Sequence, residues 1–401
     1  MLRVLLIWEL GGGFGHYSTL LPVAEEFARR QCQPYLSLQD LASSQHLLAN
    51  SPFPLLQSPL WLHVPANSAT NPLSSYSDIL KTFGFLHPIE LSGMVKAWRG
   101  MYDLVNPDLL VFNHAPTALL AARGLKIPKV TLGSGFFIPP KTDPFPPFYY
   151  WRENNLAKQK SQEQRILNSV NQVLEKLSVP VLNSLPELLA VDCDFITAFP
   201  EYDHYPFRHG GAYAGPISVD DEGATPVWPG SGEKRIFVYV ISRFPGLINL
   251  IEGLLATNYH ILMYVKGASS ALIQKYECKR LHFSTIPVKL EEVIPQADLA
   301  ITHAGIGTTM NFVMGGIPLL LLPRQTEQYL FSKRVVERGS AIVLDADNLK
   351  PEHYTEAVHK LIRNKKYTIL ARKIAESHKH YNQSEQIEKI VSKCIELMKN
   401  G

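Results

Sequence analysis

Two histidines stand in glycine-rich loops, one in each half of the chain. The first ends the stretch GGGFGH at residues 11–16, which follows the strand-like run at 4–7. The second begins the stretch HAGIGTT at residues 303–309, which follows the strand-like run at 299–302. A glycine-rich loop between a strand and a helix lets a phosphate approach the backbone N–H groups at the helix N-terminus. A histidine at such a place can exchange a proton near neutral pH.

The first loop differs from the fingerprint of a dinucleotide-binding fold. His16 stands where G-x-G-x-x-G requires its third glycine, and the strand-like run at 34–38 does not end in a clear acidic residue, Asp40 being the nearest. These two features disfavour an NAD-dependent oxidoreductase. On these residues alone the loop is either a degenerate cofactor loop or a loop that presents His16, with capping or packing as simpler roles for the histidine.

The second loop has the composition of a diphosphate site. Gly305 and Gly307 allow close approach of the backbone, and Thr308 or Thr309 can cap the helix that comes next. The N-terminus of that helix offers N–H groups and the positive end of a dipole, to which His303 can add a donor. An ordinary strand–helix turn would use the same threonine cap, but it does not need so many small residues.

Composition places the chain among globular proteins. Its 401 residues suit two domains, and hydrophobic residues make up 46% and charged residues 19% of them. The net charge of +3 is too small to indicate nucleic acid or an anionic membrane as the main partner. The longest apolar run, at 317–323, is too short for a transmembrane segment, and no signal-peptide pattern is visible. Four cysteines scattered singly predict reduced thiols and a cytoplasmic location.

Short apolar runs alternate with helical patterns in both halves, which predicts an α/β fold with two doubly wound parallel sheets. The predicted strands lie at 4–7, 34–38, 108–112, 128–132 and 195–199 in the first half, and at 235–241, 260–265, 299–302, 317–322 and 341–344 in the second. Glycine, proline, serine and aspartate crowd residues 215–234, which indicates a linker. Residues 385–400 repeat apolar side chains on one face and predict a terminal helix.

The second loop and the segment C-terminal to it resemble the family 1 type (UDP-glycosyltransferase-like) glycosyltransferases of GT-B fold. The family pattern is a His-x-Gly loop with Gly-Thr-Thr or Asn-Ser, then Gly-(Val/Ile)-Pro, then Pro-x-x-x-(Asp/Glu)-Gln. The matching residues, in order and at the family spacing, are His303, Gly305, Gly307-Thr308-Thr309, Gly316-Ile317-Pro318, Pro323 and Glu327-Gln328. The opening loop and residues 107–130 resemble the same family, and GSGFFIPP at 133–140 resembles a bacterial subgroup. The resemblance covers nearly the whole chain, strongly at 297–339 and weakly between 40 and 100.

The resemblance implies two Rossmann-like β/α/β domains that face each other across a cleft. The implied boundaries are 1–215 for an acceptor-binding domain, 216–233 for a linker, 234–380 for a nucleotide-sugar-binding domain, and 381–401 for a C-terminal helix that packs back on the first domain. The expected partners are a nucleotide-sugar donor and a small acceptor molecule, with no nucleic acid. The oligomeric state is left open.

The resemblance also implies a metal-independent, inverting transfer of a sugar from a UDP-sugar, or a dTDP-sugar, to a hydroxyl of a small aromatic or lipophilic acceptor. His16 would be the general base. The diphosphate would be held by the second loop and its helix, through His303, Gly305, Gly307, Thr308 and Thr309. Glu327 and Gln328 would bond the sugar hydroxyls, although an acidic residue in a first helical turn also complements the dipole by itself. No cofactor is expected, and no H-x-x-x-H or H-E-x-x-H spacing suggests a metal.

Three positions depart from the family pattern. Asn113 stands where many relatives have the aspartate that orients the base, so either another carboxylate serves, with Glu9 the nearest in sequence, or the base is weaker, or the chain has lost turnover. Thr285 and Asn311 replace the base-stacking tryptophan and the ribose-binding glutamate of plant relatives. The nucleobase is therefore expected to be held by the backbone near Val288.

The aromatic segment FFIPPKTDPFPPFYYW at 136–151 is a candidate acceptor pocket. Its candidate contacts are Phe136, Phe137, Phe148 and Tyr149. A loop that packs its own aromatic rings is an equal alternative. The D-x-D triplets at 192–194 and 345–347 are interpreted as structural.

Two other functions compete with transfer. A catalytically silent GT-B protein that binds nucleotide sugar or supports a partner enzyme is favoured by Asn113. A nucleotide-sugar epimerase of the same fold would act on the donor without any acceptor, and the aromatic segment argues mildly against it.

Overall fold

The computed structural model describes two compact units. The residues it describes are 1–13, 15–42, 48, 51–63, 73–219, 223–230, 234–344 and 348–400. Residues 1–219 and 382–401 form the first unit, and residues 220–381 form the second. No helix within these described residues is both long enough and apolar enough to cross a membrane.

The first unit is built on a parallel sheet of seven strands in the order β3-β2-β1-β4-β5-β6-β7. The strands are β1 (Arg3–Trp8), β2 (Gln33–Leu38), β3 (Leu55–Gln57), β4 (Leu109–Asn113), β5 (Lys129–Gly133), β6 (Cys193–Ile196) and β7 (Ala212–Tyr213). The strand order reverses between β1 and β4. In open α/β sheets, ligands bind outside the carboxyl ends of the strands at such a reversal.

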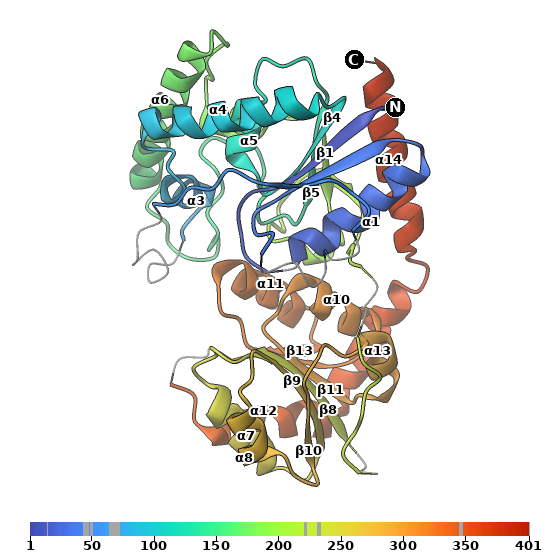
Figure 1. Ribbon diagram of the computed structural model, residues 1–401. Helices are drawn as coiled ribbons and strands as arrows, with labels where there is room; N and C mark the ends of the chain where they lie inside the picture. The colour runs from blue at the N-terminus through green and yellow to red at the C-terminus, as the bar shows by residue number, and fades with distance from the viewer. Residues whose placement is uncertain are drawn as a thin grey trace. The chain divides into compact units, whose positions relative to one another are not determined.

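Helices cover both faces of this sheet. They are α1 (Gly15–Arg29), α3 (Tyr76–Thr82), α4 (Pro88–Val105), α5 (Pro116–Ala121), α6 (Leu156–Lys176) and α14 (Gln383–Asn400), with short 3₁₀ turns at Leu185–Leu189 and Pro200–Tyr202. In β1, Val4 and Leu6 point into the core beneath α1 and α14, so Leu5 and Ile7, which are also fully buried, point to the opposite face. Figure 1 shows α1 and α14 side by side, away from α4 and α5.

The terminal helix α14 is part of the first unit because its apolar face is buried there. Ile387, Ile390, Val391 and Cys394 join the core under α1. Fully burying an aliphatic side chain of this size contributes roughly 1.5–3 kcal/mol. The Arg29–Glu388 ion pair, at 2.9 Å, lies at the exposed rim of the same contact.

The second unit repeats the same winding in a parallel sheet of six strands, β10-β9-β8-β11-β12-β13. The strands are β8 (Arg235–Ile241), β9 (His260–Lys266), β10 (Leu281–Ser284), β11 (Leu299–Thr302), β12 (Leu319–Leu321) and β13 (Ala341–Val343). The helices are α7 (Leu247–Leu255), α8 (Ser270–Tyr276), α9 (Leu290–Val293), α10 (Ile306–Met314), α11 (Thr326–Glu337), α12 (Pro351–Arg363) and α13 (Lys365–Ser377), with a 3₁₀ turn at Ile294–Gln296. The strand order reverses between β8 and β11.

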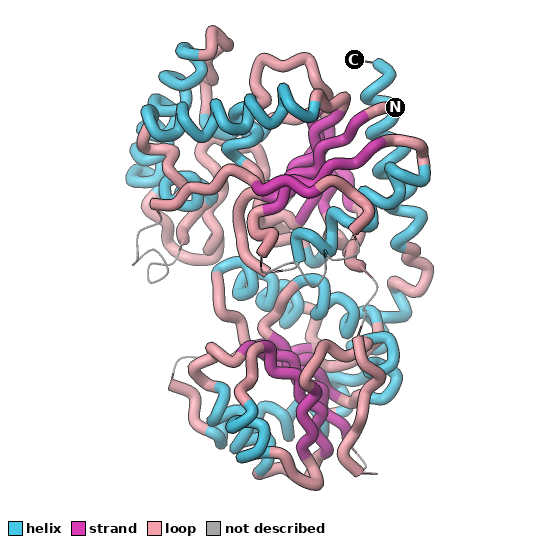
Figure 2. Tube along the Cα trace, in the orientation of Figure 1, coloured by secondary structure: helices cyan, strands magenta, loops and turns pink. Residues whose placement is uncertain are grey.

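The predicted fold class, two doubly wound parallel sheets, is confirmed. In each unit the strands gather centrally and the helices lie outside them (Figure 2). Ala224, inside the predicted linker, pairs with Val288 of the second unit: its N–H donates to the Pro287 carbonyl at 2.8 Å, and its own carbonyl accepts from the Lys289 N–H at 3.0 Å. The D-x-D triplet at 345–347 lies outside the described residues.

Candidate functional site

The first glycine-rich loop places His16 at the carboxyl end of β1. Gly11 and Gly13 have φ of +89° and +90°, which L side chains rarely adopt. A Cβ on Gly11 would also lie 2.5 Å from Nε2 of His16. A glycine is therefore needed at position 11 for two reasons: the positive φ of its backbone and the imidazole of His16 that lies against it. Helix α1 begins at Gly15, so His16 lies in its first turn.

A chain of two hydrogen bonds fixes the ring of His16. Asn113 is the last residue of β4 and lies opposite Trp8 in the strand register. Its Nδ2 donates to the carbonyl of Leu132 at 2.8 Å, so its Oδ1 faces Nδ1 of His16, at 2.5 Å. An amide oxygen only accepts, so Nδ1 of His16 carries the proton and donates. Nε2 is left with its lone pair, which is the form a general base needs.

The surroundings of His16 are aromatic and mostly apolar. Its ring stacks on Trp8 with centroids 5.1 Å apart, and it lies 5.5 Å from Phe137 and 6.1 Å from His114. Burial lowers the pKa of His16 to about 4, and the bond to Asn113 offsets only part of this effect. The ring is therefore neutral at pH 7, and Asn113 supplies no negative charge to stabilise an imidazolium.

Glu9 does not serve as the missing carboxylate. Its Oε2 accepts the backbone N–H groups of Thr117 and Ala118 at 3.0 and 3.1 Å, which places the carboxyl at the N-terminus of α5. Burial raises its pKa to about 7, although these bonds pull it down. The hypothesis that Glu9 orients His16 is therefore wrong, and Asn113 alone fills that position in the structure.

In the second unit, His303 ties together the carboxyl ends of three strands. Its Nδ1 lies 2.8 Å from the carbonyl of Leu322, which can only accept, so Nδ1 carries the proton. Its Nε2 accepts the N–H of Ile241, the last residue of β8, at 3.1 Å. Burial lowers its pKa below the ordinary histidine value. Both ring nitrogens are thus occupied, and His303 would have to exchange one bond before it could donate to a diphosphate.

The loop after β11 leaves the N-terminus of α10 open. Gly305 is its N-cap residue, is exposed, and has no atom within 4 Å of where a Cβ would lie. The first N–H groups of a helix have no partner inside it, so those of Ile306 and Gly307 can meet an anion. Thr308 is half-buried, whereas Thr309 is fully buried with its hydroxyl 3.4 Å from that of Thr302. Thr309 therefore packs into the unit.

The predicted sugar-binding pair begins α11. Glu327 and Gln328 lie in its first turn and are half-buried. The side-chain oxygen of Gln328 accepts the N–H of Arg324 at 2.8 Å, which leaves its Nε2 as the donor for a ligand. Val288 lies opposite Ala224 in a parallel bridge whose hydrogen bonds are made by its neighbours Pro287 and Lys289. The N–H and C=O of Val288 itself therefore point away from Ala224.

Comparison with known proteins shows which proteins this chain resembles. The family model of the glycosyltransferase family 28 C-terminal domain matches residues 227–390. The uncharacterized UDP-glucosyltransferase YdhE of Bacillus subtilis is 27% identical over 104 residues, 26% of either chain. A PGL/p-HBAD biosynthesis glycosyltransferase of Mycobacterium tuberculosis is 20% identical over 315 residues, 73% of this chain and 72% of that protein. The crystal structure of the glycosyltransferase VinC in complex with dTDP superimposes over 100% of both chains, with a TM-score of 0.71 at 14% identity.

The second half of the chain thus resembles a glycosyltransferase domain in sequence, and the whole chain has the fold of solved GT-B glycosyltransferases. The predicted family resemblance is thereby confirmed, although the matching domain model carries the number of family 28. The alignment with the B. subtilis relative spans only about a quarter of that protein.

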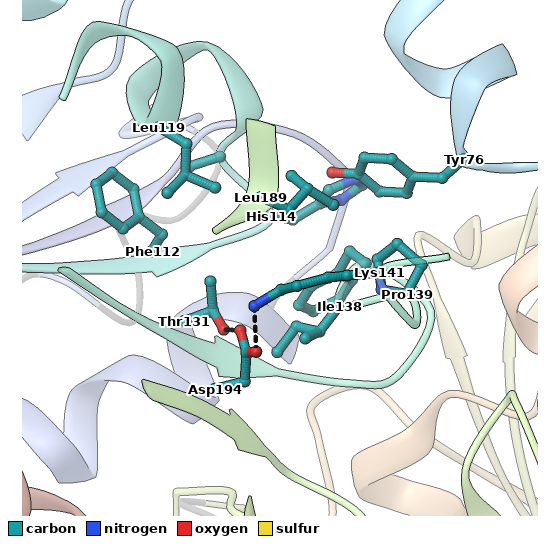
Figure 3. Close-up of a pocket in the computed structure, with 12 residues that line it drawn as sticks. Tyr76, Phe112, His114, Leu119, Thr131, Ile138, Pro139, Lys141, Leu189 and Asp194 are labelled. Carbon is teal, nitrogen blue, oxygen red and sulfur yellow. Dashed lines mark hydrogen bonds and ion pairs between the residues drawn. The ribbon is translucent and has the colours of Figure 1, made fainter. Parts of the chain in front are cut away.

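The D-x-D triplet at 192–194 has structural partners. Asp192 accepts the backbone N–H of Lys129 at 2.7 Å. Asp194 accepts the hydroxyl of Thr131 at 2.6 Å and pairs with Lys141 at 2.6 Å (Figure 3). Across the residues described, no three His, Cys, Asp or Glu side chains cluster in a way that would hold a metal ion.

The aromatic segment mostly packs on itself. Phe136 and Phe148 stack 4.7 Å apart and are buried, and Phe148 is fully inaccessible. Tyr149 is half-buried beneath the guanidinium of Arg152, 4.6 Å from its ring. Phe137 differs because it touches His16. Of the predicted acceptor contacts, Phe137 is thus beside the base, and Phe148 is closed off from any ligand in this structure.

Two residues at the site had no role in the sequence-based hypothesis. Trp8 stacks on His16, and His114 stacks on Phe137 with centroids 4.8 Å apart and ring planes 10° apart. Both follow from the fold, because each stands at the carboxyl end of a strand beside the strand-order reversal. That position was the available signal.

Proposed function

We propose that this protein is an inverting, metal-independent glycosyltransferase that moves a sugar from a nucleoside-diphosphate sugar to a hydroxyl of a small aromatic or lipophilic acceptor. The observation that carries the proposal is the hydrogen-bond chain from Leu132 through Asn113 to His16, which leaves the lone pair of His16 on Nε2. An enzyme that activates a hydroxyl needs a neutral base of fixed orientation, and this chain supplies one.

The proposed reaction is a single displacement. Nε2 of His16 takes the proton of the acceptor hydroxyl while its oxygen forms a bond to the anomeric carbon of the sugar. The bond from that carbon to the diphosphate breaks with its electron pair, so the configuration inverts. The N–H groups at the start of α10 stabilise the charge on the departing diphosphate, and Glu327 and Gln328 bond the sugar hydroxyls.

The donor is a UDP-sugar or a dTDP-sugar. Uracil and thymine present the same N–H and C=O edge, and the backbone N–H and C=O of Val288 have the complementary pair of groups. Backbone bonds at Val288 would therefore not separate the two bases. VinC, which shares the fold, was crystallised with dTDP. Scattered free cysteines support the proposed cytoplasmic location.

A second candidate is a nucleotide-sugar-binding protein without turnover. Asn113 favours it, because it offers the imidazolium no charge, and the low pKa of His16 makes it a weak base. The two candidates share donor binding and differ in transfer.

The test combines ligand binding with transfer. Thermal shifts with UDP and dTDP, with and without magnesium, report donor binding, since a ligand at a hundredfold excess over its Kd stabilises by roughly 2.7 kcal/mol. Transfer from UDP-glucose and dTDP-glucose to 7-hydroxy-4-methylcoumarin in EDTA, with NMR of the anomeric centre, reports activity and stereochemistry. His16→Ala should abolish transfer and keep the thermal shift, and the exposed His209→Ala is the matched control. Binding without transfer would favour the second candidate, and neither binding nor transfer would refute both.

A further inference from the structure

A small cavity in the first unit has His114 among its lining residues. Its volume of about 10 Å³ is close to the space that one water molecule needs. Its walls are largely apolar, formed by residues such as Phe112, Leu119 and Leu189. Figure 3 shows these side chains around one side of the space, with Lys141 reaching toward Asp194 on the other.

His114 lines this cavity and has an unpartnered ring nitrogen. The residue is buried, with 8% of its surface exposed, and its Nε2 has no hydrogen-bond partner in the protein. Its other nitrogen is bonded to the backbone of Leu10 and therefore donates to a carbonyl. Burial holds the pKa of His114 well below its ordinary value, so the ring is neutral and Nε2 is an acceptor.

Polar groups elsewhere in the cavity do not serve this nitrogen. Thr131 and Lys141 both donate to the carboxylate of Asp194. Tyr76 lines the cavity with its ring centroid 6.1 Å from that of His114, and Figure 3 shows its hydroxyl directed to the same side. An unsatisfied buried acceptor costs roughly 1–3 kcal/mol. A hydroxyl group placed here would donate to Nε2 of His114 and could accept from Tyr76.

Two residues that line the cavity, His114 and Phe137, lie beside the proposed base. Nε2 of His16 and Nδ1 of His114 both lie within 3.5 Å of the point where a Cβ of Gly11 would stand. Phe137 covers both rings, at 5.5 Å from His16 and 4.8 Å from His114. A molecule brought to His16 is therefore brought to the edge of His114 as well.

We infer that His114 recognises a second hydroxyl or amino group of the acceptor, which enters this cavity and donates to Nε2. The inference rests on the proposed function and deepens it, because it gives the acceptor class: a compact, largely apolar molecule with a hydrogen-bond donor besides the hydroxyl that receives the sugar. The size of the cavity limits the recognised group to a hydroxyl or primary amine at the edge of the acceptor. A ring does not fit.

The test compares acceptors that differ by one hydroxyl. The probes are 7-hydroxy-4-methylcoumarin and its 5,7-, 6,7- and 7,8-dihydroxy analogues. In the wild type, at least one dihydroxy probe should have a kcat/KM roughly tenfold above that of the monohydroxy probe, the ratio that corresponds to one hydrogen bond made or left unmade. His114→Phe keeps a flat ring against Phe137 and removes the nitrogen, so this ratio should fall toward one.

Two matched variants complete the set. His114→Gln retains a side-chain acceptor and should restore part of the ratio, whereas the exposed His209→Phe should leave the ratio at its wild-type value. A ratio unchanged in His114→Phe, or no preference for any dihydroxy probe in the wild type, overturns the inference.

A measurement on the unaltered protein guards against a variant that does not fold. The ¹⁵N resonance of Nε2 of His114 should move upfield when a dihydroxycoumarin is added together with UDP, and not with UDP alone. No movement with any of the three probes overturns the inference, because the cavity then holds only water. Failure of the proposed function has a different signature: no transfer to any probe, monohydroxy or dihydroxy, whether or not UDP or dTDP gives a thermal shift.

Discussion

Restoring a negative charge beside His16 tests the account of this base most directly. In Asn113→Asp a carboxylate replaces the amide oxygen that lies 2.5 Å from Nδ1 of His16. Two opposite unit charges about 4 Å apart interact by roughly 4 kcal/mol at an effective dielectric constant of 20. A neighbouring opposite charge generally raises a histidine pKa by one to three units. The pKa of His16 should therefore rise from about 4 to between roughly 5 and 7.

The same substitution has a structural cost. The amide nitrogen that now donates to Leu132 becomes an oxygen facing a carbonyl, which lowers the free energy of unfolding by roughly 1–3 kcal/mol. The stronger base should nevertheless raise kcat near pH 7, since general-base catalysis improves as the base pKa approaches the working pH.

The assay is the pH dependence of kcat/KM, together with NMR titration of His16. The base works only when it is unprotonated, so kcat/KM falls as pH drops below the pKa of His16. In the wild type this fall should come near pH 4, and in Asn113→Asp it should begin at least one pH unit higher. An acidic limb that stays in place in a folded, donor-binding variant would refute the charge argument. A wild-type limb already near pH 6.5 would refute the effect of burial.

Three further outcomes are expected. Gly11→Ala should lower the free energy of unfolding by roughly 1 kcal/mol or more from backbone strain alone. It should also nearly abolish transfer, because the new methyl displaces the imidazole of His16. Urea unfolding and coumarin transfer measure the two effects, and full activity would contradict the packing described. Acid should weaken the fold, because the pKa of His16 lies at about 4 in the folded protein and at 6.5 ordinarily. The free energy of unfolding should therefore fall by about 3 kcal/mol as pH drops from 6.5 to 4. Thermal melts across that range should show a smaller pH dependence in His16→Phe. Ile390→Ala in α14 should lower the free energy of unfolding by roughly 2–5 kcal/mol. The same change at the exposed Ile369 is the control and should lower it by far less. Equal losses would show that α14 does not belong to the core.

The doubly wound sheets could be predicted because their evidence is local. Buried parallel strands are short apolar runs, and the glycines and threonines of the second loop indicate a turn between a strand and a helix. The sequence could not distinguish the role of Thr308 from that of Thr309, since both residues can cap a helix. Only the three-dimensional packing shows that Thr309 is fully buried against Thr302.

The partners of buried polar groups were harder to predict because they depend on strand register and rotamers. Glu9 follows β1 as closely as any carboxylate does, yet its oxygen bonds the N-terminus of α5. Asn113 faces His16 because β1 and β4 align Trp8 with Asn113 and because Leu132 takes the amide nitrogen. The place of His114 in the site could not be predicted, because it depends on packing against Phe137, which comes from a different strand connection.

The two bonds of His303 have a consequence for how donor affinity should be interpreted. The ring holds the end of β8 through Ile241 and the end of β12 through Leu322. A diphosphate that recruits this ring must first release one of those strand ends, so its measured affinity is the difference between the new contact and the one given up. Weakening the internal bond, without touching any atom that meets the ligand, would then tighten donor binding. The hydrogen bonds that hold the two strand ends in the free protein would therefore compete with binding of the proposed donor.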